Sequence, residues 1–381
     1  MMRVCPVCGG TVWDGFLRTD RARSLITDQS IAPRPLDKAI CTRCGTVTNV
    51  ALGGDETLAG YADAYRLNTG RGEEHIYFTP AGPVPRSQAF LNWLRRHVPR
   101  VPESVLEIGC GKGSLMARMA DTWPGVPLRG IEGSRDAAAL ARSRGLDVTQ
   151  GFVGPEVPDA ADLVVAVGVL EHVEDPSTFL RALGQAVLPG GYAVLVIPVQ
   201  DGGGYDLWFG DHVWHLFGAQ FQTILERHGF EVLALDLEDP VVAGFGLALC
   251  RPAQDATAPP SFDGLVARQG AQRDLWADRF ADVDRSLGLV GDGPAIVFGS
   301  GEVLSLLLAY TALGDRAILG CLDEDPGKIG GTVHGIPVHP PDWLNGAPPA
   351  PVLLAVNPRY TEAVRKKLER FARPLVTLLE T

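Results

Sequence analysis

The sequence lacks any long hydrophobic run and any excess of positive charge. Although 46% of its 381 residues are hydrophobic, no apolar stretch reaches the roughly 18 residues expected of a transmembrane helix. No signal-peptide core precedes the first cysteine, Cys5. The 34 basic residues are outnumbered by 45 acidic ones, whereas nucleic-acid binding usually leaves a basic footprint. We therefore expect a cytoplasmic protein that binds neither membrane nor nucleic acid.

Cysteine is scarce, and the odd count of 7 does not suit a disulfide framework. Two knuckles of the form C-x-x-C-G, at residues 5–9 and 41–45, have the paired spacing of a zinc site. Four thiolates would complete a tetrahedral shell with no position open for water, which favours structural over catalytic zinc. A nucleic-acid-binding ribbon is the rival interpretation. The expected zinc ligands are Cys5, Cys8, Cys41 and Cys44.

The chain is organised around residues 104–113, where an apolar strand breaks into alternating glycines and then a helix. Gly109, Gly111 and Gly113 let the backbone approach a ligand with no Cβ in the way. The spacing is E-x-G-x-G-x-G and not the G-x-G-x-x-G of dinucleotide-binding turns. Glu107 would repel a pyrophosphate but suits a ligand that carries a sulfonium and an amino group. The pattern resembles motif I of class I S-adenosylmethionine (SAM) methyltransferases.

Later segments agree with this resemblance. A predicted strand at 128–132 ends in Glu132, at the offset where an acid takes ribose hydroxyls. The unbroken apolar run in 162–173 predicts a buried parallel strand, and Gly168 and Leu170 at its end complete the expected SAM-binding residues. The alternative, an NAD-type Rossmann domain, would require coincidental agreement of several segments.

We expect an α/β protein whose class I methyltransferase sheet follows an N-terminal four-cysteine module and precedes a smaller Rossmann-like domain. The last domain is indicated by a strand, a Gly299-Ser300-Gly301 turn, a helix and a second strand ending at Asp323, a weak nucleotide signal. The predicted parts are a zinc module at 1–60, a lid or connector with a helix at 61–98, a SAM-binding domain at 99–251, a linker and bridging helix at 252–290, and the last domain at 291–381.

Two further segments are candidates for substrate contacts. Residues 61–85 are rich in aromatics, including Tyr77, and are either a lid or a connector whose aromatics pack. Residues 205–217 interleave two histidines and two acids with aromatics, which makes poor core and a good pocket wall. There Asp211 beside His212 could orient an imidazole base. The alternative is that these histidines merely begin a helix.

In this order, nearly the whole chain resembles the zinc-containing nucleotide-deoxysugar C-methyltransferases of antibiotic biosynthesis. The family's C-terminal D-x-x-P-x-K-x-G run stands at 323–330. Its Y-H-E-H run corresponds to Phe209-Gly210-Asp211-His212, so the acid and the final histidine persist while Phe209 lacks the tyrosine hydroxyl.

The resemblance implies methyl transfer from SAM to a carbon of a nucleotide-linked keto-deoxysugar in secondary metabolism, in a monomer or homodimer whose C-terminal domain holds the nucleotide. A base would remove a proton beside the carbonyl, and the enolate would attack the methyl group. The implied roles are His212 as base, Asp211 orienting it, and His172 or Tyr77 steadying the enolate. Alternatives are O- or N-methyl transfer to a non-sugar intermediate, a dehydrogenase using the C-terminal glycine turn, and a zinc-ribbon scaffold without enzymatic activity.

Overall fold

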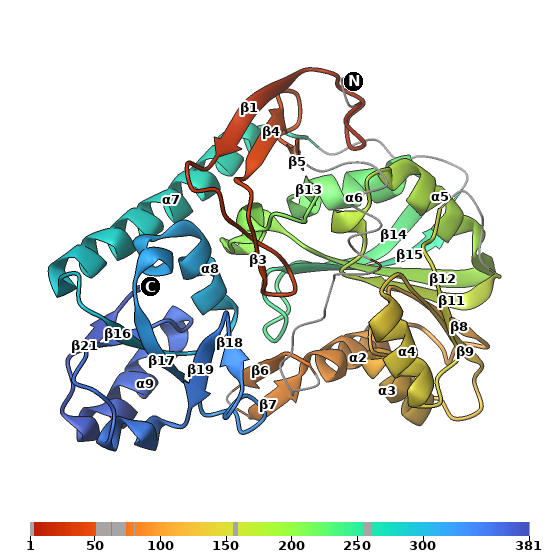
Figure 1. Ribbon diagram of the computed structural model, residues 1–381. Coiled ribbons are helices and arrows are strands. Elements are labelled where there is room, and N and C mark those ends of the chain that lie inside the picture. Colours follow the sequence, from red (N-terminus) through yellow and green to blue (C-terminus); the bar gives the residue numbers. More distant parts are fainter. Residues whose placement is uncertain are drawn as a thin grey trace.

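The computed structural model describes residues 4–50, 62, 74–79, 81–154, 159–253 and 261–380 (Figure 1). Tyr61 and Tyr65 of the predicted lid, and residues 254–260 of the predicted linker, lie outside this described part. Among the helices that are described, none combines the length and the apolar character needed to cross a membrane.

A seven-stranded sheet forms the centre of the protein, in the order β10-β9-β8-β11-β12-β15-β14. The strands β10, β9, β8, β11 and β12 run parallel, and β15 is antiparallel to both its neighbours. The predicted methyltransferase-type α/β sheet is therefore confirmed. The strands are β8 (Val105–Ile108), β9 (Leu128–Glu132), β10 (Val148–Gln150), β11 (Ala161–Val167), β12 (Val187–Pro198), β14 (Phe230–Asp236) and β15 (Phe245–Pro252).

Both faces of this sheet are covered, which explains its unbroken apolar strands. Successive residues of β11 point to opposite faces: Val164 packs in one core cluster with Phe179 and Phe221, whereas Val165 packs in the other with Trp93. The helices that carry these aromatics and their neighbours are α2 (Arg86–His97), α3 (Ser114–Thr122), α4 (Arg135–Ser143), α5 (Pro176–Gln185) and α6 (Gly218–Arg227).

The N-terminal module is completed by a strand from the predicted pocket wall. Its sheet has the order β1-β4-β5-β13, and Trp214 and His215 of β13 pair with Thr48 and Val47 of β5. The sheet of the N-terminal module therefore includes a strand from the central part of the chain, and His215 lies on that strand, not at a helix start. The strands are β1 (Trp13–Arg18), β4 (Asp37–Cys41), β5 (Val47–Asn49) and β13 (Trp214–His215).

A hairpin of β2 (Ser24–Leu25) and β3 (Ile31–Ala32) leaves the N-terminal module and reaches the last part of the chain (Figure 1). There the N–H of Leu25 donates to Tyr310 Oη at 3.0 Å. Arg21 and Arg23 both pair with Asp315. Residues 21–25 of the N-terminal module thus contact residues 310–315 of the last domain.

The last part of the chain is a second α/β layer, as the sequence predicts. The helix α7 (Leu265–Val290) leads into a six-stranded sheet of order β18-β19-β17-β16-β20-β21. Its elements are β16 (Ala295–Phe298), α8 (Glu302–Tyr310), β17 (Ile318–Leu322), β18 (Thr332–Val333), β19 (Ile336–His339), β20 (Val352–Leu354), α9 (Thr361–Leu368) and β21 (Leu375–Thr377). Near β18 and β19, Figure 1 shows the hairpin of β6 (Ile76–Thr79) and β7 (Gly82–Pro85), which carries Tyr77.

Candidate active site

The glycine turn after β8 adopts backbone angles that only glycine takes readily. Gly109, Gly111 and Gly113 have φ of 71°, 54° and 79°, all in the left-handed region. A Cβ on Gly109 would lie 2.5 Å from Cγ2 of Val169, and a Cβ on Gly113 would lie 2.1 Å from Leu146 Cδ1. The backbone conformation therefore favours glycine at all three positions, and neighbouring side chains restrict the space at Gly109 and Gly113.

The two acids predicted to bind SAM lie beneath this turn. Glu132 Oε2 accepts from the Gly111 N–H and Glu132 Oε1 from the Ser134 N–H, each at 2.7 Å. Glu107 is buried, and its Oε2 has no hydrogen-bond partner among the described residues. Burial, with the nearby charge of Glu132, raises the pKa of Glu107 well above its usual value. An orphaned buried carboxylate oxygen fits a ligand that brings N–H donors and positive charge, as SAM does.

The residues that follow β11 connect the glycine turn to the first of the candidate histidines, His172. Val169 packs on Gly109, and the short helix η1 (Leu170–His172) follows at once. Gly168 has φ of 66°, and a Cβ there would approach both Arg86 and Glu171. Leu170, by contrast, turns its side chain into the core beside the four-cysteine module. Two residues were predicted to contact SAM here. Gly168 lies at the end of β11, next to the residue that packs on the glycine turn, whereas the Leu170 side chain is buried in the core.

A buried carboxylate collects the histidines of the predicted pocket wall. His212 Nδ1 and His215 Nδ1 lie 2.5 and 2.6 Å from the two oxygens of Asp206, and Gln200 Nε2 donates to the same carboxylate at 2.6 Å. Burial opposes ionisation, but the two histidines hold the pKa of Asp206 below its usual value. Because a carboxylate only accepts, both imidazoles present N–H at Nδ1.

The sequence assigned the orienting role to Asp211, but the carboxylate that hydrogen-bonds the His212 ring is that of Asp206. The Asp211 carboxylate accepts from the Thr27 N–H at 3.1 Å and lies 3.8 Å from His172 Nδ1. It therefore influences His212 only through its charge. Adjacency in sequence was misleading because the chain turns between Asp211 and His212, while the helix η3 (Asp206–Trp208) brings Asp206 back toward the ring.

With Nδ1 committed, the free electron pair of neutral His212 is on Nε2. Burial alone would lower the pKa of His212, but the contact with Asp206 outweighs it and raises the pKa. Nε2 lies 3.0 Å from Thr27 Oγ1, which belongs to the loop between β2 and β3. His172 stands edge-on to His212, with ring centroids 4.7 Å apart. The sequence did not single out Thr27.

His172 is set up differently from His212. Its Nδ1 lies 3.2 Å from the backbone carbonyl of Asp211, which requires the proton on Nδ1. Burial, together with the nearby His212, lowers the pKa of His172 to about 4. His172 is therefore a neutral ring whose Nε2 accepts and does not donate.

The β6 strand and the last domain approach the same region. Tyr77 is buried, which raises its pKa, and the charges of Arg86 and Glu302 act on its hydroxyl. Glu302, the first residue of α8, accepts a hydrogen bond from Tyr205 Oη. Burial raises the pKa of Glu302, and the positive charge of Arg86 opposes the increase. Glu302 is a further polar group that the sequence did not reveal.

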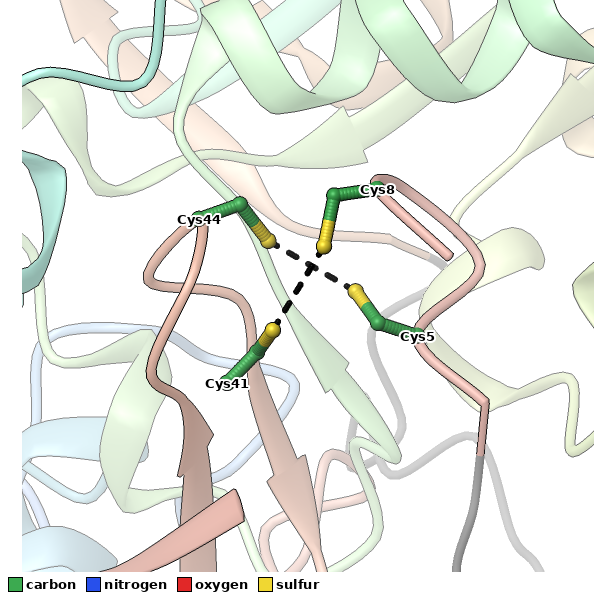
Figure 2. A group of neighbouring side chains, drawn as sticks. All are labelled: Cys5, Cys8, Cys41 and Cys44. Atoms are coloured by element: carbon green, nitrogen blue, oxygen red, sulfur yellow. Dashed lines mark hydrogen bonds between the residues drawn. The ribbon is translucent and has the colours of Figure 1, made fainter. Parts of the chain in front are cut away.

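The predicted zinc ligands form one buried cluster. Figure 2 shows the thiols of the two knuckles pointing toward one another, with Sγ distances of 3.5 Å for Cys5 to Cys44 and 3.5 Å for Cys8 to Cys41. All four sulfurs lie within 4.8 Å of one another. Four thiolates about 2.3 Å from one tetrahedral ion would be roughly 3.8 Å apart, so the donor set and spacing fit zinc.

Comparison with known proteins identifies the central part of the chain. Residues 86–235 match the family model described as "Methyltransferase domain". The ubiquinone biosynthesis O-methyltransferases of Stutzerimonas stutzeri and Pseudomonas entomophila are 33% and 34% identical over 110 residues, which are 26% of this chain and 47% of each relative. The chain thus spans about half the length of these curated relatives.

Among solved structures, an S-adenosylmethionine dependent methyltransferase from Mesorhizobium loti is 21% identical, with a TM-score of 0.37, over 43% of this chain and 97% of that one. This similarity is too weak to bear on function. The match to the methyltransferase family model, with the glycine turn and its acids, shows a methyltransferase domain over residues 86–235 and agrees with the predicted enzyme class and SAM cofactor.

We predict that Gly109→Ala weakens SAM binding by at least about tenfold, equivalent to ~1.4 kcal/mol, because its methyl group would strike Val169. Gly145→Ala is the matched control, since Gly145 also has a positive φ of 84° but no atom within 4 Å of its Cβ position. Both variants therefore pay a similar backbone cost. Calorimetric titration with SAM measures the difference, and equal affinities in the two variants would contradict the assignment of the turn.

Proposed function

We propose that this protein transfers the methyl group of SAM to a carbon of a nucleotide-linked keto-deoxysugar by way of an enolate. The observation that carries the proposal is the buried pair of Asp206 and His212 beside the end of β11. Removing a proton from carbon needs a positioned base of raised basicity in a site that excludes water. A histidine held by a buried carboxylate meets this need.

SAM held at the glycine turn would supply the methyl group. Glu107 would face its positively charged amino-acid end, and Glu132 its ribose hydroxyls. His212 Nε2 would accept the proton from the carbon beside the carbonyl, and Asp206 would stabilise the resulting imidazolium. Because His172 lacks a free N–H, the Tyr77 hydroxyl is the better donor to the enolate oxygen.

Positive charge near β6 supports a nucleotide diphosphate as part of the acceptor. The charges of three cations act on the ring of His75: Arg86, Lys328 and Arg359. They come from α2, from the loop between β17 and β18, and from the short helix η6 (Pro358–Tyr360). Cations that converge from separate elements can neutralise a diphosphate despite the acidic composition of the chain.

The C-terminal glycine turn gives little support to the dehydrogenase alternative. Asp323 Oδ2 accepts from the Ser300 N–H at 3.0 Å, so the protein's own carboxylate occupies a backbone donor that a pyrophosphate would use. Lys328 Nζ lies 3.6 Å from the same carboxylate. We therefore assign the last domain to acceptor binding.

O-methyl transfer to a non-sugar intermediate is the second candidate. The matched relatives carry O-methyltransferase names, and Phe209 stands where the resembled family has a tyrosine. A hydroxyl acceptor needs a weaker base than a carbon acid does.

The two candidates differ in what happens to the acceptor's carbon-bound hydrogen. We expect dTDP-keto-deoxysugars, and not phenol or amine acceptors, to cause release of S-adenosylhomocysteine. With S-adenosylhomocysteine in place of SAM, the enzyme in D₂O should exchange the hydrogen beside the sugar carbonyl, as mass spectrometry can measure. Turnover of a phenol without any exchange would establish the second candidate instead.

The base assignment predicts a difference between two neighbouring acids. His212→Asn and Asp206→Asn should lower turnover by about 100-fold or more, because one removes the base and the other its charge partner. Asp211→Asn, the matched control, should have a much smaller effect because Asp211 does not hydrogen-bond the His212 ring. SAM affinity should be unchanged in all three variants. A larger loss in Asp211→Asn than in Asp206→Asn would refute this arrangement.

We also propose that the four-cysteine cluster holds one structural zinc ion. The Gln220 side chain on α6 donates to the Cys44 carbonyl at 2.5 Å, so order in the cluster is passed to the central domain. The full chain should contain about one zinc per molecule by elemental analysis. Cys44→Ser should lose the metal and melt at a lower temperature, whereas Cys321→Ser, also buried but outside the cluster, should keep the metal. A metal-free wild-type chain of normal stability would rule out the zinc.

A further inference from the structure

A lysine from the four-cysteine module is buried against the histidine network. Lys38, in β4, is 1% exposed, and Ile40, which is also buried, lies on the same face of the strand. Its ammonium donates to the Phe209 carbonyl at 2.7 Å and contacts His215 Nε2. No ion pair among the described residues joins it to a carboxylate. Fully buried lysines are rare without such a partner.

The donor chemistry of lysine determines the state of His215. An ammonium group only donates hydrogen bonds, so His215 Nε2 must accept. The single proton of neutral His215 is then on Nδ1, where it is donated to Asp206 Oδ2 at 2.6 Å. A continuous chain of contacts thus runs from Lys38 through His215 and Asp206 to Nδ1 of His212.

We propose that Lys38 is a positioning residue that holds His215 as a neutral Nδ1–H donor and thereby reserves the negative charge of Asp206 for His212. Two histidines share one carboxylate. If His215 gained a second proton, on Nε2, its positive charge would neutralise Asp206, and His212 would lose the partner that raises its basicity. A protonated Lys38 on the far side of His215 opposes this second protonation.

The charges around the network agree with this role. Burial lowers the pKa of His215 to about 4, and Lys38 is the next strongest cause. Burial also lowers the pKa of Lys38 itself to about 7, against the charges of Asp206 and Asp211. Other titratable groups that face the network come from η1, α8 and α2, and they are Glu171, His172, Glu302 and Arg86.

The catalytic consequence rests on the proposed function, but the protonation of His215 can be measured without acceptor or SAM. The full chain labelled with ¹⁵N-histidine would be titrated from pH 8 to pH 6, with ring nitrogens followed by long-range ¹H–¹⁵N correlation. His215→Gln and His212→Asn assign the signals. The wild type should show His215 neutral and protonated on Nδ1 throughout. A cationic or Nε2–H His215 in the wild type would overturn the proposal, whether or not any variant folds.

Lys38→Met and Lys38→Arg then separate charge from packing. In Lys38→Met, His215 should gain a proton within the titrated range, and the pKa of His212 should fall. Lys38→Arg keeps a cation and should keep His215 neutral. Unchanged SAM affinity would show that the variants are folded, and a folded Lys38→Met with wild-type histidine titrations would refute the proposal.

If a methyl acceptor is found, Lys38→Met should also move the rising limb of kcat/KM to lower pH, because a weaker base loses its proton earlier, and lower the plateau. A purely structural role would leave the position of the limb unchanged. Failure of every acceptor would count against the proposed function and leave the histidine measurements as the test of Lys38.

Discussion

The buried carboxylate of Asp206 is the interaction on which the rest of the site depends. It accepts hydrogen bonds from Gln200, His212 and His215, and a buried carboxylate is stable only when such donors surround it. Each partner lies on a different stretch of the segment between β12 and α6. The shared charge therefore gives a loop with little regular structure one defined conformation and fixes the Nδ1 proton of each imidazole.

This loop also joins the parts of the protein. His215 belongs to β13, which completes the sheet of the four-cysteine module. Asn49 of that module donates to the Gly210 carbonyl at 2.9 Å, and Thr27 of the β2–β3 hairpin contacts His212. The N-terminal module is thus a wall of the site as well as a neighbour of it. The strands β4 and β5 connect the cysteine cluster to the histidines, because β4 ends at Cys41 and β5 pairs with the strand that carries His215.

The last domain meets the site from the other side. Glu302, at the start of α8, accepts a hydrogen bond from Tyr205. Tyr310, at the end of the same helix, donates one to the Trp208 carbonyl. Their hydrogen bonds hold the aromatic part of the loop, while Asp206 holds its histidines. A single segment of the central domain is therefore held by both flanking parts.

The sequence by itself determined the local features: the central sheet, the glycine turn with Glu107 and Glu132, and the cysteine knuckles. Strand periodicity, positive-φ glycines and ligand spacing are properties of neighbouring residues, so they can be read along the chain.

Only the tertiary structure decided which charges meet. Asp206 reaches His212 across a turn while adjacent Asp211 does not, and Lys38 meets His215 from a strand 177 positions away. Such contacts arise when separate elements pack together, and no local pattern encodes them.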